Sequence, residues 1–149
     1  LALRALRLAS TGQALIAPAF QQLQGEFFLR TGERDKGRAM LREVVRTTRA
    51  LPGPDNWVQA LFTLESIART ARTSGDWEFA AWASQQMLEH DPNYAGSHYA
   101  AALSARQAGD RATAQREFAA AARLWARADP ALAEMSEVRA AQKLQTTTP

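Results

Sequence analysis

Two glycine-aspartate pairs, 34 residues apart, constrain the fold of this chain more than any other feature. They are Gly75-Asp76 and Gly109-Asp110, and their spacing is the period of a common helix-turn-helix repeat. A glycine ends a helix well because it adopts a left-handed conformation without steric cost. An aspartate directly after it can cap the next helix. The two pairs therefore predict two consecutive helical hairpins of the same kind.

Small residues recur at matching positions around both turns. An alanine stands seven positions before each glycine, another four positions before it, and a third five positions after it. Small side chains let the two helices of a hairpin approach closely, so that the ridges of one helix enter the grooves of the other. The alanines are Ala68, Ala71 and Ala80 around the first turn, and Ala102, Ala105 and Ala114 around the second.

A third hairpin is predicted upstream, around Gly32. Gly25 and Gly37 take the small positions there, and Gly32 lies 43 residues before Gly75, nine more than the 34-residue period. The Leu-Pro-Gly-Pro sequence at 51–54 falls in this interval, and such residues break helices. We therefore expect the nine extra residues to separate the first hairpin from the second.

These residues resemble the tetratricopeptide repeat (TPR) family over roughly residues 13–130. Gly75-Asp76 and Gly109-Asp110 match the turn between the two helices of a repeat in that family, and Asp91-Pro92 matches its closing Asp-Pro pair. The chain also departs from the pattern. The tryptophan often found near the start of a repeat is replaced by Gln21, Leu64 and His98.

The resemblance implies an all-α fold, a right-handed α-superhelix of about three hairpins plus a C-terminal capping helix. We expect the hairpins at about 13–50, 55–93 and 94–130, the capping helix at 131–145 and a frayed tail at 146–149. Residues 1–12 are apolar and basic, and we interpret them as the remnant helix of an upstream segment. No part of the sequence has the alternating pattern of a strand.

Helical spacing of the large apolar residues predicts the core. In the first helix we expect Phe20, Leu23, Phe27 and Phe28 to be buried. In the helix that starts near residue 55, Trp57 is expected to begin the buried stripe.

In the family, the first helix of each hairpin lines a concave groove, and the resemblance implies which residues lie there. The mixture of aromatic side chains, arginine and glutamate suits a peptide or protein ligand, because aromatic side chains bury area and arginines pair with carboxylates. The alternative is that these residues only solvate the face or pack against the capping helix. They are Gln22, Glu26, Leu29 and Arg30, then Phe62, Glu65, Arg69 and Arg72, then Tyr99, Leu103 and Arg106.

Some members of the family bind a C-terminal carboxylate through a clamp of lysine and asparagine. The clamp residues are absent here, so binding to the tails of chaperones is not expected. The corresponding positions carry Gln22, Glu26, Ser66, Gly96 and Ala100.

A row of arginines in the predicted helix 34–50 offers a second binding hypothesis. The row could bind an acidic partner, nucleic acid or anionic lipid, but such rows are more often solvated helix faces. Helical repeats that read RNA need regular base-reading side chains, and none repeats here. The row consists of Arg34, Arg38, Arg42 and Arg46, with Arg49 beyond it and Glu33, Asp35 and Glu43 among them.

No constellation in the sequence predicts an enzyme, a metal site or a cofactor. Cysteine is absent, which excludes disulfides and thiolate metal sites. The two histidines, His90 and His98, lack a metal-binding helix spacing. With no such site, the resemblance to the repeat family implies a soluble, non-catalytic scaffold for protein interaction, as a subunit or domain of a larger complex. The absence of cysteine does not choose between the cytoplasm and the periplasm.

Overall fold

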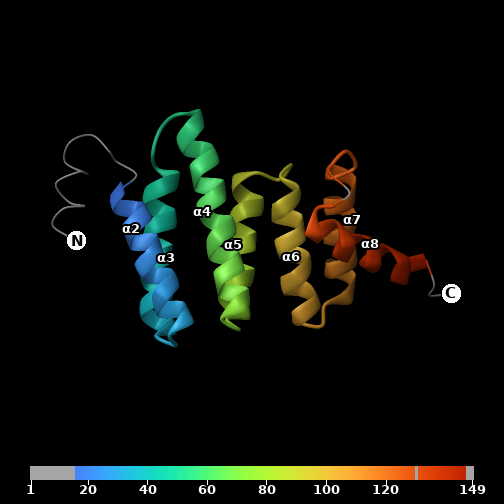
Figure 1. Ribbon diagram of the computed structural model, residues 1–149, viewed down its shortest axis with the longest axis horizontal. Coiled ribbons are helices and arrows are strands. Elements are labelled where there is room, and N and C mark those ends of the chain that lie inside the picture. Colours follow the sequence, from blue (N-terminus) through green and yellow to red (C-terminus); the bar gives the residue numbers. More distant parts are fainter. Residues whose placement is uncertain (1–15, 130, 147–149) are drawn as a thin grey trace. The chain divides into compact units, whose positions relative to one another are not determined.

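The computed structural model describes residues 16–129 and 131–146, with side chains up to residue 143. The described residues form seven α-helices and no strand, which confirms the all-α class (Figure 1). The remnant helix predicted at 1–12 lies outside the described residues. The helices are α2 (Ile16–Arg30), α3 (Arg34–Arg49), α4 (Pro54–Thr73), α5 (Trp77–His90), α6 (Ala95–Gln107), α7 (Arg111–Leu124) and α8 (Ala133–Thr146).

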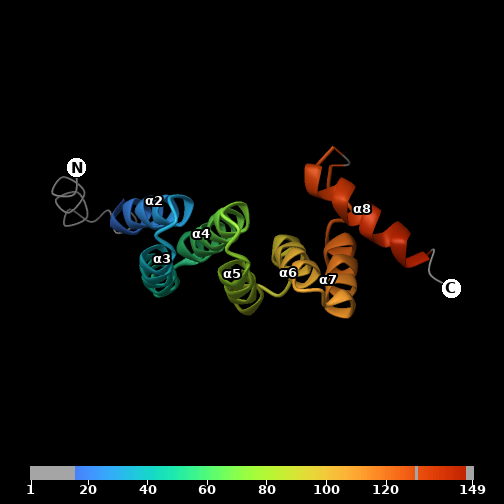
Figure 2. The ribbon, with the colours of Figure 1, turned by 90° about the horizontal axis from the view of Figure 1, so that it is seen from below.

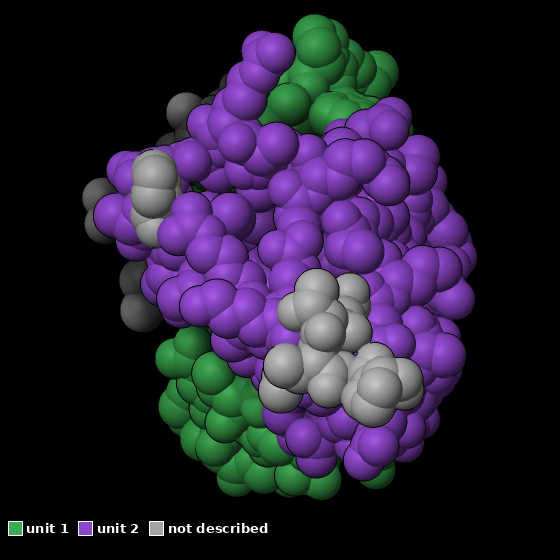
Figure 3. Space-filling view, turned by 90° about the vertical axis from the view of Figure 1, so that its right-hand side faces the viewer, with its two compact units in different colours: residues 1–76 green, residues 77–149 purple. Residues whose placement is uncertain are grey.

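The chain divides into two compact units, residues 1–76 and 77–149 (Figure 3). In the first unit, α2 packs against both α3 and α4, and α3 also packs against α4 (Figure 2). In the second unit, α6 packs against α5 and α7, and α7 packs against α8. Each unit is thus built from helices that contact their neighbours in the sequence.

Two glycines allow α2 and α3 to pack unusually closely. A Cβ atom added to Gly37 would lie 2.9 Å from the carbonyl oxygen of Gly25, and one added to Gly25 would lie 2.6 Å from Cγ of Leu41. Leu29 and Leu41 are buried beside these glycines. Both glycines are therefore needed for the close approach, as predicted from their place at the positions that require a small residue. Leu29, which the resemblance assigned to the groove, faces α3 instead.

The two glycine turns have the predicted backbone conformation. Gly75 and Gly109 have φ angles of 69° and 80°, in the left-handed region that favours glycine. After Gly109, the Asp110 carboxylate accepts a hydrogen bond of 3.0 Å from the backbone N–H of Thr113 and caps α7. This bond lowers the pKa of the Asp110 carboxyl group. The predicted cap is confirmed at this helix.

Three side chains that were predicted to be buried lie on the surface. Leu23 is 67% exposed, Phe27 is 59% exposed, and Trp57 is also exposed. Helix α2 has two packed sides, one against α3 and one against α4, so a third side is left uncovered. Leu23 and Phe27, one turn apart, lie on that side. The prediction was wrong because periodicity locates apolar stripes without showing how many neighbours cover them.

The glycine contact leads to a prediction about Gly37→Ala. Alanine normally stabilises a helix by about 1 kcal/mol relative to glycine. Here the added Cβ meets backbone atoms, so we expect a net loss of about 1–3 kcal/mol in the free energy of unfolding. Urea unfolding followed by circular dichroism measures the change. Ala39→Gly, at an exposed position of the same helix, reports the propensity effect alone. A Gly37→Ala variant as stable as wild type would contradict the close contact.

Candidate functional site

The first unit exposes a group of large apolar side chains on two adjacent helices. Leu23 and Phe27 lie on α2, and Val58 and Phe62, which are 40% and 54% exposed, lie on α4. Spacings of three and four residues place charged side chains on the same two helix sides. We call this surface the α2–α4 face, and define it by Leu23, Phe27 and Arg30 of α2 and by Val58, Phe62, Glu65 and Arg69 of α4.

A buried carboxylate beside this face joins α2 to α4. Glu26 is only 8% exposed. It accepts hydrogen bonds from Ser66 Oγ at 2.7 Å and Thr70 Oγ1 at 3.1 Å, both on α4, and from Gln22 Nε2 at 2.9 Å. Three donors satisfy the charge that burial would otherwise penalise. Gln22 and Glu26, assigned to the groove by resemblance, therefore lie at the seam between the two helices.

A pocket of about 400 Å³ lies where the C-terminal halves of α2 and α4 meet. It brings together four of the predicted groove residues, Arg30, Phe62, Glu65 and Arg69. Arg30 Nη2 contacts Thr70 Oγ1 at 3.4 Å on its wall. The full lining is Arg30, Phe62, Glu65, Ser66, Arg69, Thr70 and Thr73.

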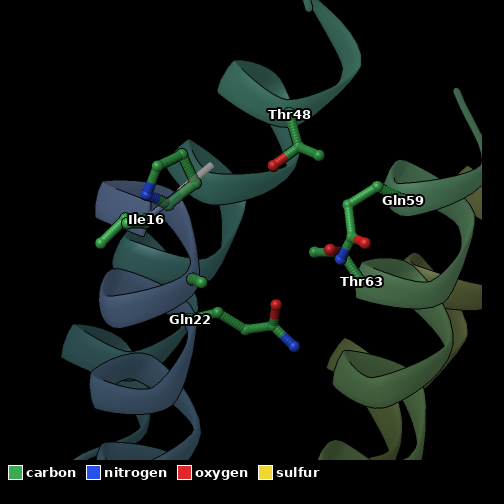
Figure 4. A pocket seen from close by; sticks show the side chains of 7 residues that line it. Ile16, Gln22, Thr48, Gln59 and Thr63 are labelled. Carbon is green, nitrogen blue, oxygen red and sulfur yellow. The ribbon is translucent and has the colours of Figure 1, made fainter. Parts of the chain in front are cut away.

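A second pocket, of about 280 Å³, lies toward the N-terminal ends of α2 and α4 and was not predicted (Figure 4). Amide and hydroxyl groups line it together with apolar side chains, and none of these lining residues is charged. Its residues come from α2, α3 and α4, so no local sequence motif marks it. The lining consists of Ile16, Pro18, Ala19, Gln22, Thr48, Gln59 and Thr63.

The groove residues predicted in the third hairpin contact α8 in the second unit. The Tyr99 hydroxyl donates to Glu137 Oε2, and Arg106 Nη2 donates to Glu137 Oε1 at 2.6 Å. Leu103 is buried in a cluster that includes Val138 of α8. This arrangement is the alternative considered from the sequence, in which these side chains pack against the capping helix. Arg72, in the last turn of α4, is half-buried.

Part of the arginine row is engaged in contacts within the chain. Arg38 forms two bonds to the buried Asp76, with Nε to Oδ2 at 2.8 Å and Nη2 to Oδ1 at 2.5 Å. Arg34 Nη2 donates to the Ser74 carbonyl oxygen at 3.3 Å. These two arginines therefore tie α3 to the turn that follows α4. Neither contact could be read from the charge pattern of α3.

The next arginines of the row remain at the surface. Arg42 is exposed, and Arg46 pairs with Glu43, one turn earlier, at 2.8 Å and 2.5 Å. The hydrogen bond from Arg46 lowers the pKa of the Glu43 carboxyl group. This pair neutralises part of the charge that an anionic ligand would meet.

One histidine has partners at both ring nitrogens. His98 Nδ1 lies 2.7 Å from Glu117 Oε2, and Nε2 lies 2.9 Å from the Pro92 carbonyl oxygen. His98 therefore links α6 to α7 and to the loop that precedes α6, and this contact is structural. Across the described residues, no three side chains of metal-ligating type gather into a metal-binding group.

Comparisons with known proteins do not assign a function to the site, so its geometry is the evidence for what it does. The chain matches no protein-family model, and no curated protein matches it. None of the described helices combines the length and the apolar character needed to cross a membrane.

The two bidentate arginine pairs lead to a prediction. Asp76 is buried, so Arg38→Ala removes the bidentate guanidinium from a desolvated carboxylate and is expected to cost about 3 kcal/mol of unfolding free energy. Arg46→Ala removes a pair of similar geometry that is exposed to solvent, and surface pairs contribute little. We therefore expect no measurable shift in its unfolding midpoint. If the two variants unfolded at the same urea concentration, the pair of Arg38 with Asp76 would not stabilise the fold.

Proposed function

We propose that this chain is a non-catalytic scaffold of the tetratricopeptide repeat type, and that it binds a peptide or protein surface through the α2–α4 face. The observation that carries the proposal is the gathering of exposed apolar side chains with arginines on two adjacent helices of one unit. Single exposed apolar residues are common on protein surfaces, but neighbouring ones with a polar rim are typical of interaction sites.

The residue types of the face suit an anchored interface. Burying one leucine or phenylalanine side chain in a partner contributes about 1.5–3 kcal/mol. Phe62 can supply such an anchor beside the pocket, and Arg69 can pair with a carboxylate. Interfaces commonly depend on a few aromatic and arginine residues of this kind.

Two features of the fold support the repeat family as the framework. The glycine turns after α4 and α6 share a left-handed backbone, and α2 and α3 meet through paired glycines. The arginine row is the weaker candidate surface, because Arg34, Arg38 and Arg46 already hold partners within the chain.

The proposal predicts that Phe62→Ala combined with Arg69→Glu weakens partner binding without unfolding the chain. Both side chains are exposed, so helicity by circular dichroism should not change. Loss of one anchor and reversal of one charge should weaken a groove partner by about tenfold or more. Affinity capture from a lysate of the source organism, with quantitative mass spectrometry, measures the recovery of each captured protein.

A matched control removes the same kinds of side chain elsewhere. Leu124→Ala combined with Arg123→Glu changes an exposed apolar residue and an exposed arginine of α7. This variant should recover the same partner as wild type. If the Phe62/Arg69 variant recovered every partner at wild-type yield, the α2–α4 face would not be the binding surface.

A further inference from the structure

We propose that the partner segment on the α2–α4 face is an amphipathic helix that places apolar side chains on Leu23 and Phe62 and a carboxylate between Arg30 and Arg69. This inference rests on the proposed function and specifies the chemistry of the ligand at the same face. It follows from the order of side chains along the two helices, from their charges, and from a similar contact inside the second unit.

Along each helix of the face the exposed apolar side chains come before the arginine, because α2 and α4 run in the same direction, and Phe62 also lines the pocket that both arginines reach. The smaller pocket joins the N-terminal halves of both helices, and the larger pocket joins their C-terminal halves. Leu23 and Phe62 precede the central contact of Glu26 with Ser66, whereas arginines follow it on both helices. A ligand that lies along the two helices therefore contacts Leu23 and Phe62 about two turns before it reaches the guanidinium groups.

The exposed charge at the C-terminal end is carried mainly by Arg30 and Arg69. The described partner of Arg30 is the neutral hydroxyl of Thr70, at 3.4 Å. Arg69 has a side chain that is 64% exposed and lies 3.8 Å from Glu65, so this surface pair is weak. The Glu26 carboxylate is buried and already accepts from three donors. A carboxylate from a partner would form stronger, charge-assisted bonds to the two guanidinium groups.

The spacing along α2 matches that of a helical ligand. Leu23 and Arg30 are seven residues apart, which corresponds to roughly 10.5 Å along a helix axis. A ligand helix spans the same distance between positions i and i+7, and positions i, i+4 and i+7 lie on one side of it. Two apolar residues at i and i+4 and an acidic residue at i+7 can therefore reach the apolar and cationic ends together.

The second unit contains a contact with the same chemistry. Helix α8 buries Val138 in the cluster with Leu103, and the adjacent Glu137 accepts from Tyr99 and Arg106. One glutamate and one buried valine of this helix are thus held by an aromatic residue, an arginine and an apolar cluster. The α2–α4 face offers Phe62, Arg30 and Arg69 without such a helix among the described residues, so it has the groups to bind one from a partner.

The test uses two synthetic helical peptides stabilised by a side-chain staple. Both carry leucine at i and i+4, and they differ only in glutamate or lysine at i+7. Fluorescence anisotropy measures their dissociation constants for the full chain. We expect the glutamate peptide to bind wild type about tenfold or more tightly than the lysine peptide, which is a difference of ~1.4 kcal/mol. Arg30→Glu with Arg69→Glu should reverse the order, and Phe62→Ala should weaken both peptides.

The control variant carries Arg123→Glu and Arg127→Glu, which change the net charge equally at exposed positions outside the face. It should keep the wild-type order of affinities. Equal binding of the two peptides to wild type would overturn the carboxylate site, and the lysate capture would still judge the proposed function separately. Binding of neither peptide would overturn the helical ligand. Binding that Phe62→Ala leaves unchanged would place the peptides elsewhere and overturn the inference.

Discussion

The geometry of the α2–α4 face depends on the buried carboxylate of Glu26. A carboxylate is costly to bury unless hydrogen-bond donors surround it, and two of its three donors, Ser66 and Thr70, belong to α4. The bonds therefore determine which side of α2 meets α4. On another side of α2 the paired glycines require contact with α3. Because α3 and α4 cover two sides of α2, Leu23 and Phe27 lie on the third side, exposed to solvent.

The second unit joins helices by a related contact. Glu137 of α8 accepts from the Tyr99 hydroxyl and from Arg106 of α6, beside the apolar cluster that contains Val138. In both units, a glutamate lies between helices that are distant in sequence and accepts from side chains on the neighbour. Such polar contacts specify one relative position of two helices, because a carboxylate moved by a turn loses its donors. Apolar packing alone is less selective.

The arginines of α3 show why a charge pattern is a poor guide to a binding surface. Arg38 and Arg46 lie eight residues apart in the same row, and each forms a bidentate pair. One pair holds a buried aspartate of the turn after α4, and the other lies in solvent and lowers the pKa of Glu43. Only burial separates a structural role from a surface one. By contrast, Arg30 and Arg69 come from different helices and meet at one pocket.

The sequence by itself determined the local features of this protein, namely its helices, the glycine turns at Gly75 and Gly109, and the close contact of the small residues. These depend on backbone conformation and on residues near in the chain, so pattern and spacing predict them. The resemblance to the repeat family also assigned Phe62 and Arg69 to the same surface. Only the tertiary structure decided that Leu23 is exposed and that Glu137 meets the third hairpin. Exposure and pairing depend on which distant helices cover each side of a given helix, and helical periodicity carries no information about those neighbours.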